Sequence, residues 1–324
     1  MNLIYALKDG RAVHVSEVES GLKCGCVCPA CGEPLVAKKG KIMVNHFAHA
    51  SGGTCEYGYE SALHLAAKEL IAKARKFTIP AVYLSFPNTH KKKQLISDSK
   101  EITVDGVELE YRCGSIIPDI MLLSGKKKLF VEIFVTHKVD ECKQKEIEQL
   151  HVSTIQIDLS KCEKTITVEE LSEILIGDSD LKKWIYNEYA AQKLKCFIDS
   201  AEKYSIVFRG GPFHVDNCPM HMRTWKGKSY ANYIDDCLCC EYCISAQEEN
   251  GILCTGKSRI AVLDDFNIPK EERALLKPHK EENPQNIYVE GHCPICGGRL
   301  MQKQDQKGIF VGCANKSFCS YRKM

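Results

Sequence analysis

The stretch PDIMLLSGKKKLFVEIF, residues 118–134, decides the fold of the middle of the chain. Its two apolar runs predict strands over 116–123 and 129–137, because Gly125 and three lysines separate them. Working outward, Pro80 ends a helical stretch and charged helical residues follow the second strand. The expected helix, three strands, helix and strand lie at 60–77, 101–111, 116–123, 129–137, 140–150 and 153–159. This order predicts a mixed α/β (α+β) fold.

Two carboxylates stand out in this stretch. Asp119 lies on one predicted strand and Glu132 on the next, and Glu132 shares a strand face with Phe134 because side chains alternate. Val131 and Ile133 flank Glu132, and a buried carboxylate needs a partner or a metal. We interpret the pair as ligands of one hard cation, Mg²⁺ or Mn²⁺, which would activate water against a phosphodiester.

The preceding helix adds a polar stripe to this site. Glu60, His64 and Lys68 follow one another at intervals of four residues, so they share one helix face. We expect this face to project toward the two carboxylates. All five residues are therefore candidate catalytic residues.

Cysteines are the second prominent feature, with 19 in 324 residues. The chain has no apolar run of the ~20 residues that span a bilayer, and its first ten residues do not resemble a signal peptide. We therefore expect a cytoplasmic protein without a membrane partner, whose cysteines hold metal rather than form disulfides. The net charge of +2 does not decide for or against nucleic acid.

Three cysteine clusters predict structural zinc at two or three sites. In the first, the knuckle Cys28-Pro-Ala-Cys31 is followed by His46-Phe-Ala-His49, with Cys55 as a substitute for either histidine. Cys24 and Cys26 are interpreted as spare thiols.

The C-terminal cluster has Cys293 and Cys296 before a hydrophobic strand and Cys313 and Cys319 after it, and these four are its expected ligands. The pattern resembles the zinc ribbons of bacterial type I topoisomerases, which implies contact with single-stranded DNA. Phe310, Phe318 and Tyr321 are candidates either to stack on bases or to form the small core of the ribbon.

The middle cluster leaves its ligand set open. The favoured ligands are Cys218, Cys237, Cys240 and Cys254. Cys240-Glu-Tyr-Cys243 is an overlapping alternative knuckle, and His221 is an alternative partner.

These features divide the sequence into six expected segments. They are an N-terminal zinc module, a central core, a helical segment, a middle zinc module, a linker and a C-terminal ribbon, at 1–55, 56–160, 161–215, 216–256, 257–286 and 287–324.

The central segment resembles two known groups. Its element order, with Pro118-Asp119 and Glu132-x-Phe134, looks like the PD-(D/E)XK nuclease core. More narrowly, CPxC…HFAH, then Glu60-Ser61-x-x-His64-x-x-x-Lys68 and the Pro-Asp strand are similar to the competence protein CoiA-like family. The resemblance covers residues 20–160. It implies a metal-dependent nuclease acting on DNA in uptake, recombination or defence, with Asp119 and Glu132 as metal-binding carboxylates and Glu60 as the helix glutamate.

One position departs from the nuclease pattern. That pattern has Lys two residues after the Glu, where this chain has Phe134. Lys68, Lys143 and His137 are candidates to replace it. The alternatives are a catalytically degenerate fold that binds nucleic acid, or an adaptor whose zinc modules bind a protein partner.

Overall fold

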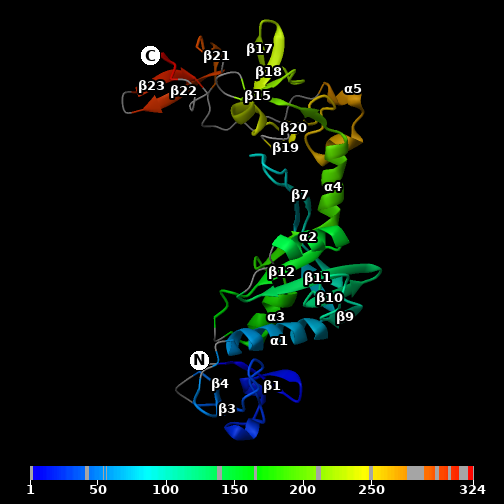
Figure 1. Cartoon of the computed structure of the whole chain (residues 1–324), viewed down its shortest axis with the longest axis vertical. Coiled ribbons are helices and arrows are strands. Elements are labelled where there is room, and N and C mark those ends of the chain that lie inside the picture. Colours follow the sequence, from blue (N-terminus) through cyan, green and yellow to red (C-terminus); the bar gives the residue numbers. More distant parts are fainter. Residues whose placement is uncertain are drawn as a thin grey trace. The chain divides into compact units, whose positions relative to one another are not determined.

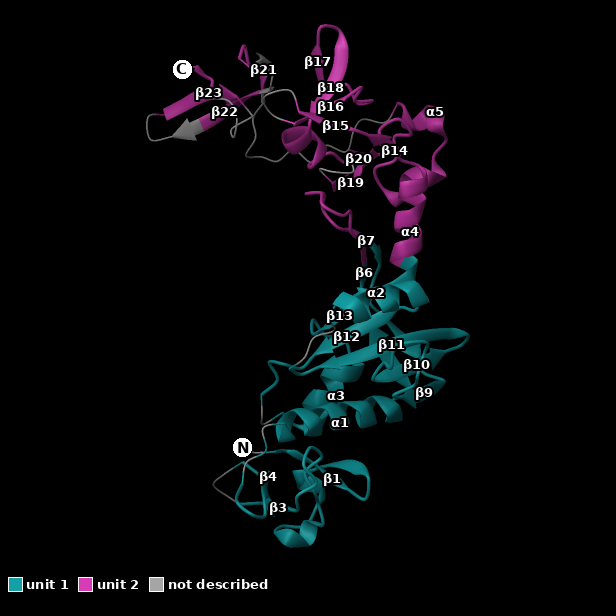
Figure 2. Ribbon diagram, in the orientation of Figure 1, with its two compact units in different colours: residues 1–82, 95–189 teal, residues 83–94, 190–324 magenta. Residues whose placement is uncertain are grey.

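Figure 1 shows the computed structural model of the chain. The structure describes residues 3–40, 44–53, 55, 57–136, 141–163, 166–208, 213–247, 251–275, 288–295, 299–305, 308–313 and 320–323. The chain forms two compact units (Figure 2), each taken by itself below. Unit 1 comprises residues 1–82 and 95–189, and unit 2 comprises residues 83–94 and 190–324. No helix of the described residues is both long enough and apolar enough to cross a membrane.

Unit 1 begins with a small module of two hairpins. Strands β1 (Tyr5–Lys8) and β2 (Arg11–His14) are joined by Asp9 and Gly10. Both turn residues have positive φ, 49° and 77°, as a two-residue hairpin turn requires. The second hairpin pairs β3 (Leu35–Lys38) with β4 (His46–His49), and two 3₁₀ turns, η1 (Val15–Glu17) and η2 (Leu22–Cys24), connect the hairpins.

A five-stranded mixed sheet forms the centre of unit 1, in the spatial order β13-β12-β11-β10-β9. Strands β11 and β12 are parallel, and every other neighbouring pair is antiparallel. A parallel pair needs a crossover connection, and helix α2 (Glu141–Leu150) supplies it. The strands are β9 (Gly106–Leu109), β10 (Ile120–Ser124), β11 (Lys127–Phe134), β12 (Thr154–Asp158) and β13 (Lys182–Tyr186).

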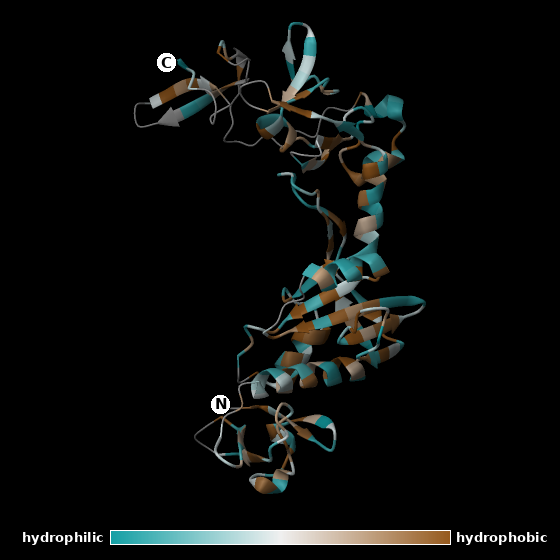
Figure 3. Ribbon diagram, viewed as in Figure 1, coloured by the Kyte–Doolittle hydropathy of each residue, from teal (hydrophilic) through white to brown (hydrophobic). Residues whose placement is uncertain are grey.

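Helices cover both faces of this sheet, so its central strands are largely apolar. On one face, α1 (Gly58–Lys73) and α3 (Val168–Ile176) pack against alternate residues of the strands, including Val131 and Ile155. On the other face, Ile147 of α2 packs against Met121 and Phe130. Figure 3 shows apolar and polar stretches alternating along α1, as a helix with one buried face requires.

The segment between α1 and β9 differs from the expected helix and single strand. Helix α1 ends at Lys73, and the residues after it form β5 (Lys76–Ile79), with Phe77 fully buried. The expected strand at 101–111 divides into β8 (Lys100–Thr103), which pairs with β5, and β9 in the central sheet. The short strands β6 (Val82–Leu84) and β7 (Gln94–Ser97) also pair with each other.

The expected helical segment at 161–215 is only partly helical, so that expectation is corrected. Helices α3 and α4 (Glu188–Asp199) are separated by β13, which pairs with β12 at the edge of the central sheet. Trp184-Ile185-Tyr186 favours a strand, and Gly177 ends α3 before it. The compact unit built on the central sheet therefore continues beyond residue 160 to residue 189.

Unit 2 holds two antiparallel sheets beside α4. One has the order β14-β20-β19 and the other the order β15-β16-β18-β17. A π-helical turn, η3 (Tyr233–Cys237), follows β18. The strands are β14 (Glu202–Tyr204), β15 (Ile206–Phe208), β16 (Phe213–Asp216), β17 (Arg223–Trp225), β18 (Lys228–Asn232), β19 (Cys243–Gln247) and β20 (Gly251–Cys254).

The first part of the expected linker at 257–286 is folded. It contains η4 (Leu263–Asn267) and α5 (Lys270–Arg273). Asp265 is buried and accepts hydrogen bonds from the backbone N–H groups of Ala261 and Val262. Pro269 does not prevent this packing, because it precedes the first turn of α5, where proline is tolerated. Residues 276–286 lie outside the described residues.

The C-terminal residues of unit 2 form an antiparallel meander in the order β21-β22-β23-β24. Cys293, Leu300 and Cys313 are buried in its small core, with Tyr321 packed against them. The strands are β21 (Tyr288–His292), β22 (Arg299–Asp305), β23 (Gly308–Cys313) and β24 (Arg322–Lys323).

Candidate metal centre and candidate active site

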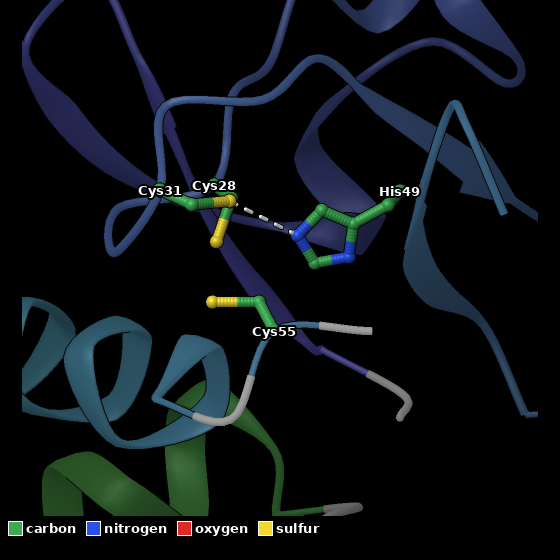
Figure 4. A group of neighbouring side chains, drawn as sticks. All are labelled: Cys28, Cys31, His49 and Cys55. Carbon is green, nitrogen blue, oxygen red and sulfur yellow. Dashed lines mark hydrogen bonds between the residues drawn. The ribbon is translucent and has the colours of Figure 1, made fainter. Parts of the chain in front are cut away.

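Four side chains of the N-terminal module gather into one metal-binding cluster. The ligand atoms of Cys28, Cys31, His49 and Cys55 all lie within 4.8 Å of one another. Figure 4 shows the three sulfur atoms and the His49 ring around a common space, with Cys31 Sγ 3.4 Å from His49 Nε2. Three thiols and one imidazole are a frequent ligand set of structural Zn²⁺, so the cluster supports a structural zinc ion.

The local backbone explains the arrangement of the first two ligands. The N–H of Gly32 donates to the carbonyl of Cys28 at 2.8 Å, which closes a tight turn around the knuckle. Gly32 has φ 73°, a conformation that glycine adopts without strain. Burial raises the pKa of Cys28 to about 11, whereas the backbone N–H of Glu33 lowers that of Cys31. Metal binding here therefore displaces protons.

The predicted ligand His46 is not in this cluster, and Cys55 takes its place. The sequence His46-Phe-Ala-His49 forms strand β4 rather than a turn, so the two rings point to opposite faces. His46 is buried and its Nδ1 lies 2.9 Å from the carbonyl oxygen of Val44. Cys24 and Cys26 are buried thiols with bonds to backbone carbonyls, as spare thiols would be.

The zinc cluster is connected directly to helix α1. The N–H of Gly58, the first residue of α1, donates to the carbonyl of Cys55 at 3.3 Å. A Cβ atom on Gly58 would lie 3.4 Å from Cys28 Sγ and from Leu3. The start of α1 is therefore packed against two of the four ligands, which places the helix relative to the cluster.

The polar residues Glu60, His64 and Lys68 of α1 each contact a residue at or near the central strands. Glu60 accepts a hydrogen bond from Thr136, just beyond β11. One turn later, His64 Nε2 lies 3.0 Å from Asp119 Oδ2. After another turn, Lys68 Nζ lies 3.3 Å from Asp119 Oδ1. The predicted shared face of Glu60, His64 and Lys68 is thus present, and two of its three residues contact Asp119.

Asp119 immediately precedes β10, at the end of the antiparallel pairing between β10 and β11. The last paired residues are Ile120 and Val131, and the next position outward puts Asp119 beside Glu132. The Asp119 carboxylate accepts the N–H of Ile133 at 2.8 Å. Burial by itself would raise the pKa of Asp119, but the bonds from His64 and Ile133 and the charge of Lys68 lower it to about 2. Asp119 is therefore ionised at neutral pH.

Glu132 is the more unusual carboxylate, because only 5% of it is exposed and it has one unpaired oxygen. Its Oε2 lies 2.7 Å from Lys143 Nζ of α2. Its Oε1 is buried and has no hydrogen-bond partner among the described residues. Burial raises the pKa of Glu132 to about 6, against the opposing effect of Lys143. A buried carboxylate oxygen without a partner is costly, and a cation or a bound water would satisfy it.

Lys143, one of the sequence candidates for a lysine near the carboxylates, contacts Glu132. Phe134 is buried, while Lys143 reaches Glu132 from the crossover helix. Lys68, the second sequence candidate, contacts the other carboxylate, and His137 lies outside the described residues. Glu60 forms no compact group of ligand atoms with Asp119 and Glu132 in the described part of the chain.

Two residues of this site were not predicted. Glu110, just after β9, lies 2.9 Å from Lys68 Nζ. Gln156 of β12 is the register partner of Glu132 on the parallel strand. Only the pairing of the strands reveals Gln156, and no local sequence signal distinguishes Glu110 from other surface glutamates.

The middle and C-terminal cysteines are also gathered. Cys218, Cys237, Cys240 and Cys254 line a single pocket of unit 2 together with Cys243. In the ribbon, Cys293 and Cys313 are buried in the same small core, whereas Cys296, Phe318 and Cys319 lie outside the described residues. One face of Phe310 is covered by Arg322, whose guanidinium carbon is 4.0 Å from the ring centroid.

Comparison with known proteins identifies the two ends of the chain. Residues 14–58 match the model of the N-terminal domain of the competence protein CoiA. The matched range contains all four residues of the zinc cluster and ends at the first residue of α1. Residues 290–323 match the topoisomerase DNA-binding C4 zinc finger, which contains the four predicted ribbon cysteines. No curated protein and no solved structure matches the chain.

Proposed function

We propose that this protein is a metal-dependent nuclease that acts on DNA, with its active centre at Asp119 and Glu132. The observation that carries the proposal is the state of Glu132. Its carboxylate is buried beside Asp119, one oxygen is paired with Lys143, and the other has no partner within the described part of the chain. An unpartnered buried carboxylate oxygen destabilises a packed core, whereas a metal-binding site uses such an oxygen as a ligand.

The donor set fits a hard cation. Mg²⁺ and Mn²⁺ prefer carboxylate oxygens, and Glu132 Oε1 together with the Asp119 carboxylate would hold such an ion. When bound, the ion supplies an acidic water and positive charge against the phosphate. The ammonium group of Lys143 lowers the pKa of Glu132 and so favours its ionised form, and it places a positive charge beside the proposed metal site. His64 and Lys68 orient Asp119.

The fold supports the same proposal. The α1 helix, the antiparallel β9-β10-β11 strands, the crossover helix α2 and the parallel β12 follow the order of the PD-(D/E)XK core. Lys143 would perform the role of the missing motif lysine from α2 instead of from β11. The chain would then have the lysine of the nuclease pattern, but on a helix instead of on the strand that carries the glutamate.

DNA is the proposed substrate because of the two matched models. One is named for a competence protein and the other for a topoisomerase DNA-binding finger. The ribbon carries exposed basic residues on β24, beginning with Arg322. We place the protein in DNA uptake, recombination or defence, with the ribbon binding the strand that the central site cleaves.

The deciding experiment compares cleavage by the wild type with that of Asp119→Asn combined with Glu132→Gln. We expect Mg²⁺- or Mn²⁺-dependent degradation of single- or double-stranded DNA by the wild type, and none by the double variant at unchanged zinc content. Glu108→Gln, an exposed change on β9, is the matched control and should cleave like the wild type. Equal cleavage by the double variant would refute the site.

A second candidate function rests on Asp119. Both of its oxygens already have partners in His64, Lys68 and Ile133, which is also how a structural carboxylate is satisfied. A degenerate core that only presents the zinc modules to DNA predicts retention on DNA with or without Mg²⁺ and no cleavage. The wild-type measurement in the same assay separates the two functions.

A further inference from the structure

Unit 2 has a second group of metal-ligating side chains, independent of the proposed nuclease site and of both matched models. Five thiols line one pocket there, and they come from four separate parts of the chain. They are Cys218, Cys237, Cys240, Cys243 and Cys254. All but Cys240 are buried, and Cys240 is half-buried. In the described residues these sulfur atoms are not grouped as tightly as those of the N-terminal cluster.

The N-terminal cluster provides an internal standard for a ligating cysteine in this protein. There, the backbone N–H groups of Cys31 and Ala30 favour the thiolate of Cys28, and that of Glu33 favours the thiolate of Cys31. In each case one of these N–H groups is two residues beyond the cysteine. This turn directs an N–H dipole at the sulfur and so stabilises a thiolate, the form that binds a metal.

Three of the five thiols in unit 2 have a backbone contact at the same spacing. Gly256 N–H donates to Cys254 Sγ at 3.3 Å. Likewise, the backbone N–H of Tyr242 favours the thiolate of Cys240, and Ser245 contacts Cys243 through its backbone, with its carbonyl oxygen 3.8 Å from Cys243 Sγ. Cys237 differs, because it ends the π-helical turn η3 and its sulfur has no such backbone donor among the described residues.

A half-buried cation, Lys91, lies next to the same knuckle. Lys91 Nζ donates to the carbonyls of Glu241 and Ala261 at 2.5 and 2.7 Å, so its position is fixed. Its charge acts on Cys240 and Cys243. A cation held there would offset the negative charge of a site with four thiolates.

The fourth thiol is identified by close packing. A Cβ on Gly256 would lie 2.8 Å from Pro219, 3.2 Å from Met220 and 3.3 Å from Cys254 Sγ. The turn after Cys254 therefore lies directly against the turn that begins at Cys218, where the N–H of His221 donates to the carbonyl of Cys218. Glycine is required at 256 for this approach.

We propose that unit 2 holds a Zn²⁺ ion on Cys218, Cys240, Cys243 and Cys254, with Cys237 as a neighbouring thiol that does not bind it. Four sulfur ligands suit zinc in a closed structural site. The ion would join the turn after η3, the β19–β20 hairpin and the loop after β16, which also share one apolar core.

The test is metal analysis of the full-length protein and of two matched serine variants in the same pocket. We expect Cys243→Ser to lose one zinc per chain relative to wild type, and Cys237→Ser to keep the wild-type number. The opposite result would overturn the ligand assignment, and an unchanged number in both would overturn the site. Iron with acid-labile sulfide in place of this zinc would overturn the choice of metal.

Histidine variants keep the test valid if a serine variant fails to fold, because histidine can still bind the ion. With Co²⁺ in place of zinc, we expect Cys243→His to weaken the thiolate-to-cobalt absorption by one ligand and Cys237→His to leave the spectrum unchanged. Identical spectra for Cys243→His and wild type would contradict the proposal.

Discussion

At the scale of single residues, Lys143 is the side chain whose role is easiest to isolate. It pairs with Glu132 at 2.7 Å and belongs to α2, a mostly polar helix whose buried residue is Ile147. We expect Lys143→Ala to lower the cleavage rate roughly 100- to 10,000-fold, the range for losing a positioned charged group. Lys145→Ala, an exposed change on the same helix, should leave the rate unchanged. Equal rates for both variants would mean that Lys143 has no part in catalysis.

Glu132 gives a pH-dependent prediction. Its pKa is raised from 4.5 to about 6 by burial, so between these values the folded protein holds a proton that the unfolded chain has lost. Stability then falls as the pH rises through this window and changes no further above it. Glu132→Gln cannot ionise, so we expect its free energy of unfolding to rise relative to wild type by on the order of 2 kcal/mol between pH 4.5 and 6.5.

Urea unfolding without Mg²⁺ measures this difference. The chain has two tryptophans, and unit 1 contains Trp184 while unit 2 contains Trp225. A Trp225→Phe background therefore lets fluorescence report on unit 1 alone. The exposed variant Glu108→Gln is the control. Stability curves of Glu132→Gln and wild type that run parallel across this pH range would contradict the raised pKa.

The N-terminal cluster predicts a contrast between a cysteine and a histidine. We expect Cys55→Ser to release one zinc per chain, because it removes one of four clustered ligands. His46→Ala should keep that zinc, since the His46 ring points away from the cluster and contacts Val44. Metal analysis of the purified variants checks both. Zinc loss from His46→Ala alone would restore the ligand set expected from the sequence.

At the scale of elements, β13 is the part of unit 1 that can be tested most directly. Its Lys182 is buried, and Nζ donates to the carbonyls of Thr78 and Gly177, each at 2.8 Å. The ammonium also lies 3.9 Å from the centroid of Phe77. This one side chain therefore joins β13 to β5 and to the end of α3.

We expect Lys182→Ala to destabilise unit 1 by about 2–4 kcal/mol, because it leaves two buried carbonyls without a donor and removes packing over Phe77. Lys183→Ala, one position along and exposed, should cost less than about 0.5 kcal/mol. The Trp184 fluorescence midpoint in urea measures both. Similar costs for the two variants would show that β13 is not fixed to the sheet through Lys182.

The same elements show what sequence alone can predict. The order of helices and strands around residues 118–134 was predictable, because two apolar runs separated by a glycine and lysines have few other solutions. The strand β13 was not, since a short run near Trp184 fits a helix or a strand and only pairing with β12 decides. Cys55 could be named only as an alternative ligand, because the faces of His46 and His49 depend on whether their stretch forms a strand or a turn. The Lys143–Glu132 pair needed the position of α2.

At the scale of the whole molecule, the two units are interleaved in sequence. Residues 83–94 leave unit 1 and belong to unit 2, and the chain then returns to unit 1 for residues 95–189. Within unit 2, Phe86 packs edge-on against Phe197 with ring centroids 5.3 Å apart, and the N–H of His90 donates to the carbonyl of Leu238. The segment 83–94 is thus an integral part of a unit formed mostly by later residues.

This interleaving predicts that unit 1 cannot be isolated by a simple truncation. A fragment of residues 1–189 would carry Leu84 and Phe86 without the partners that bury them in unit 2. We expect it to bind a hydrophobic dye and to aggregate more readily than the full chain. Replacing both residues with serine in the fragment should reduce both effects. A fragment that stays monomeric and dye-free without these changes would contradict the interleaved arrangement.

The same interleaving also affects how the protein emerges from the ribosome. The segment 83–94 is synthesised before residues 95–189, which complete unit 1. Its own partners in α4, just after η3 and in β19 follow roughly 100 to 150 residues later. At ~5–20 residues per second, this segment waits on the order of ten seconds with apolar side chains uncovered. The nascent chain is therefore exposed to premature association during translation, and a ribosome-bound chaperone would have this short segment as its natural target.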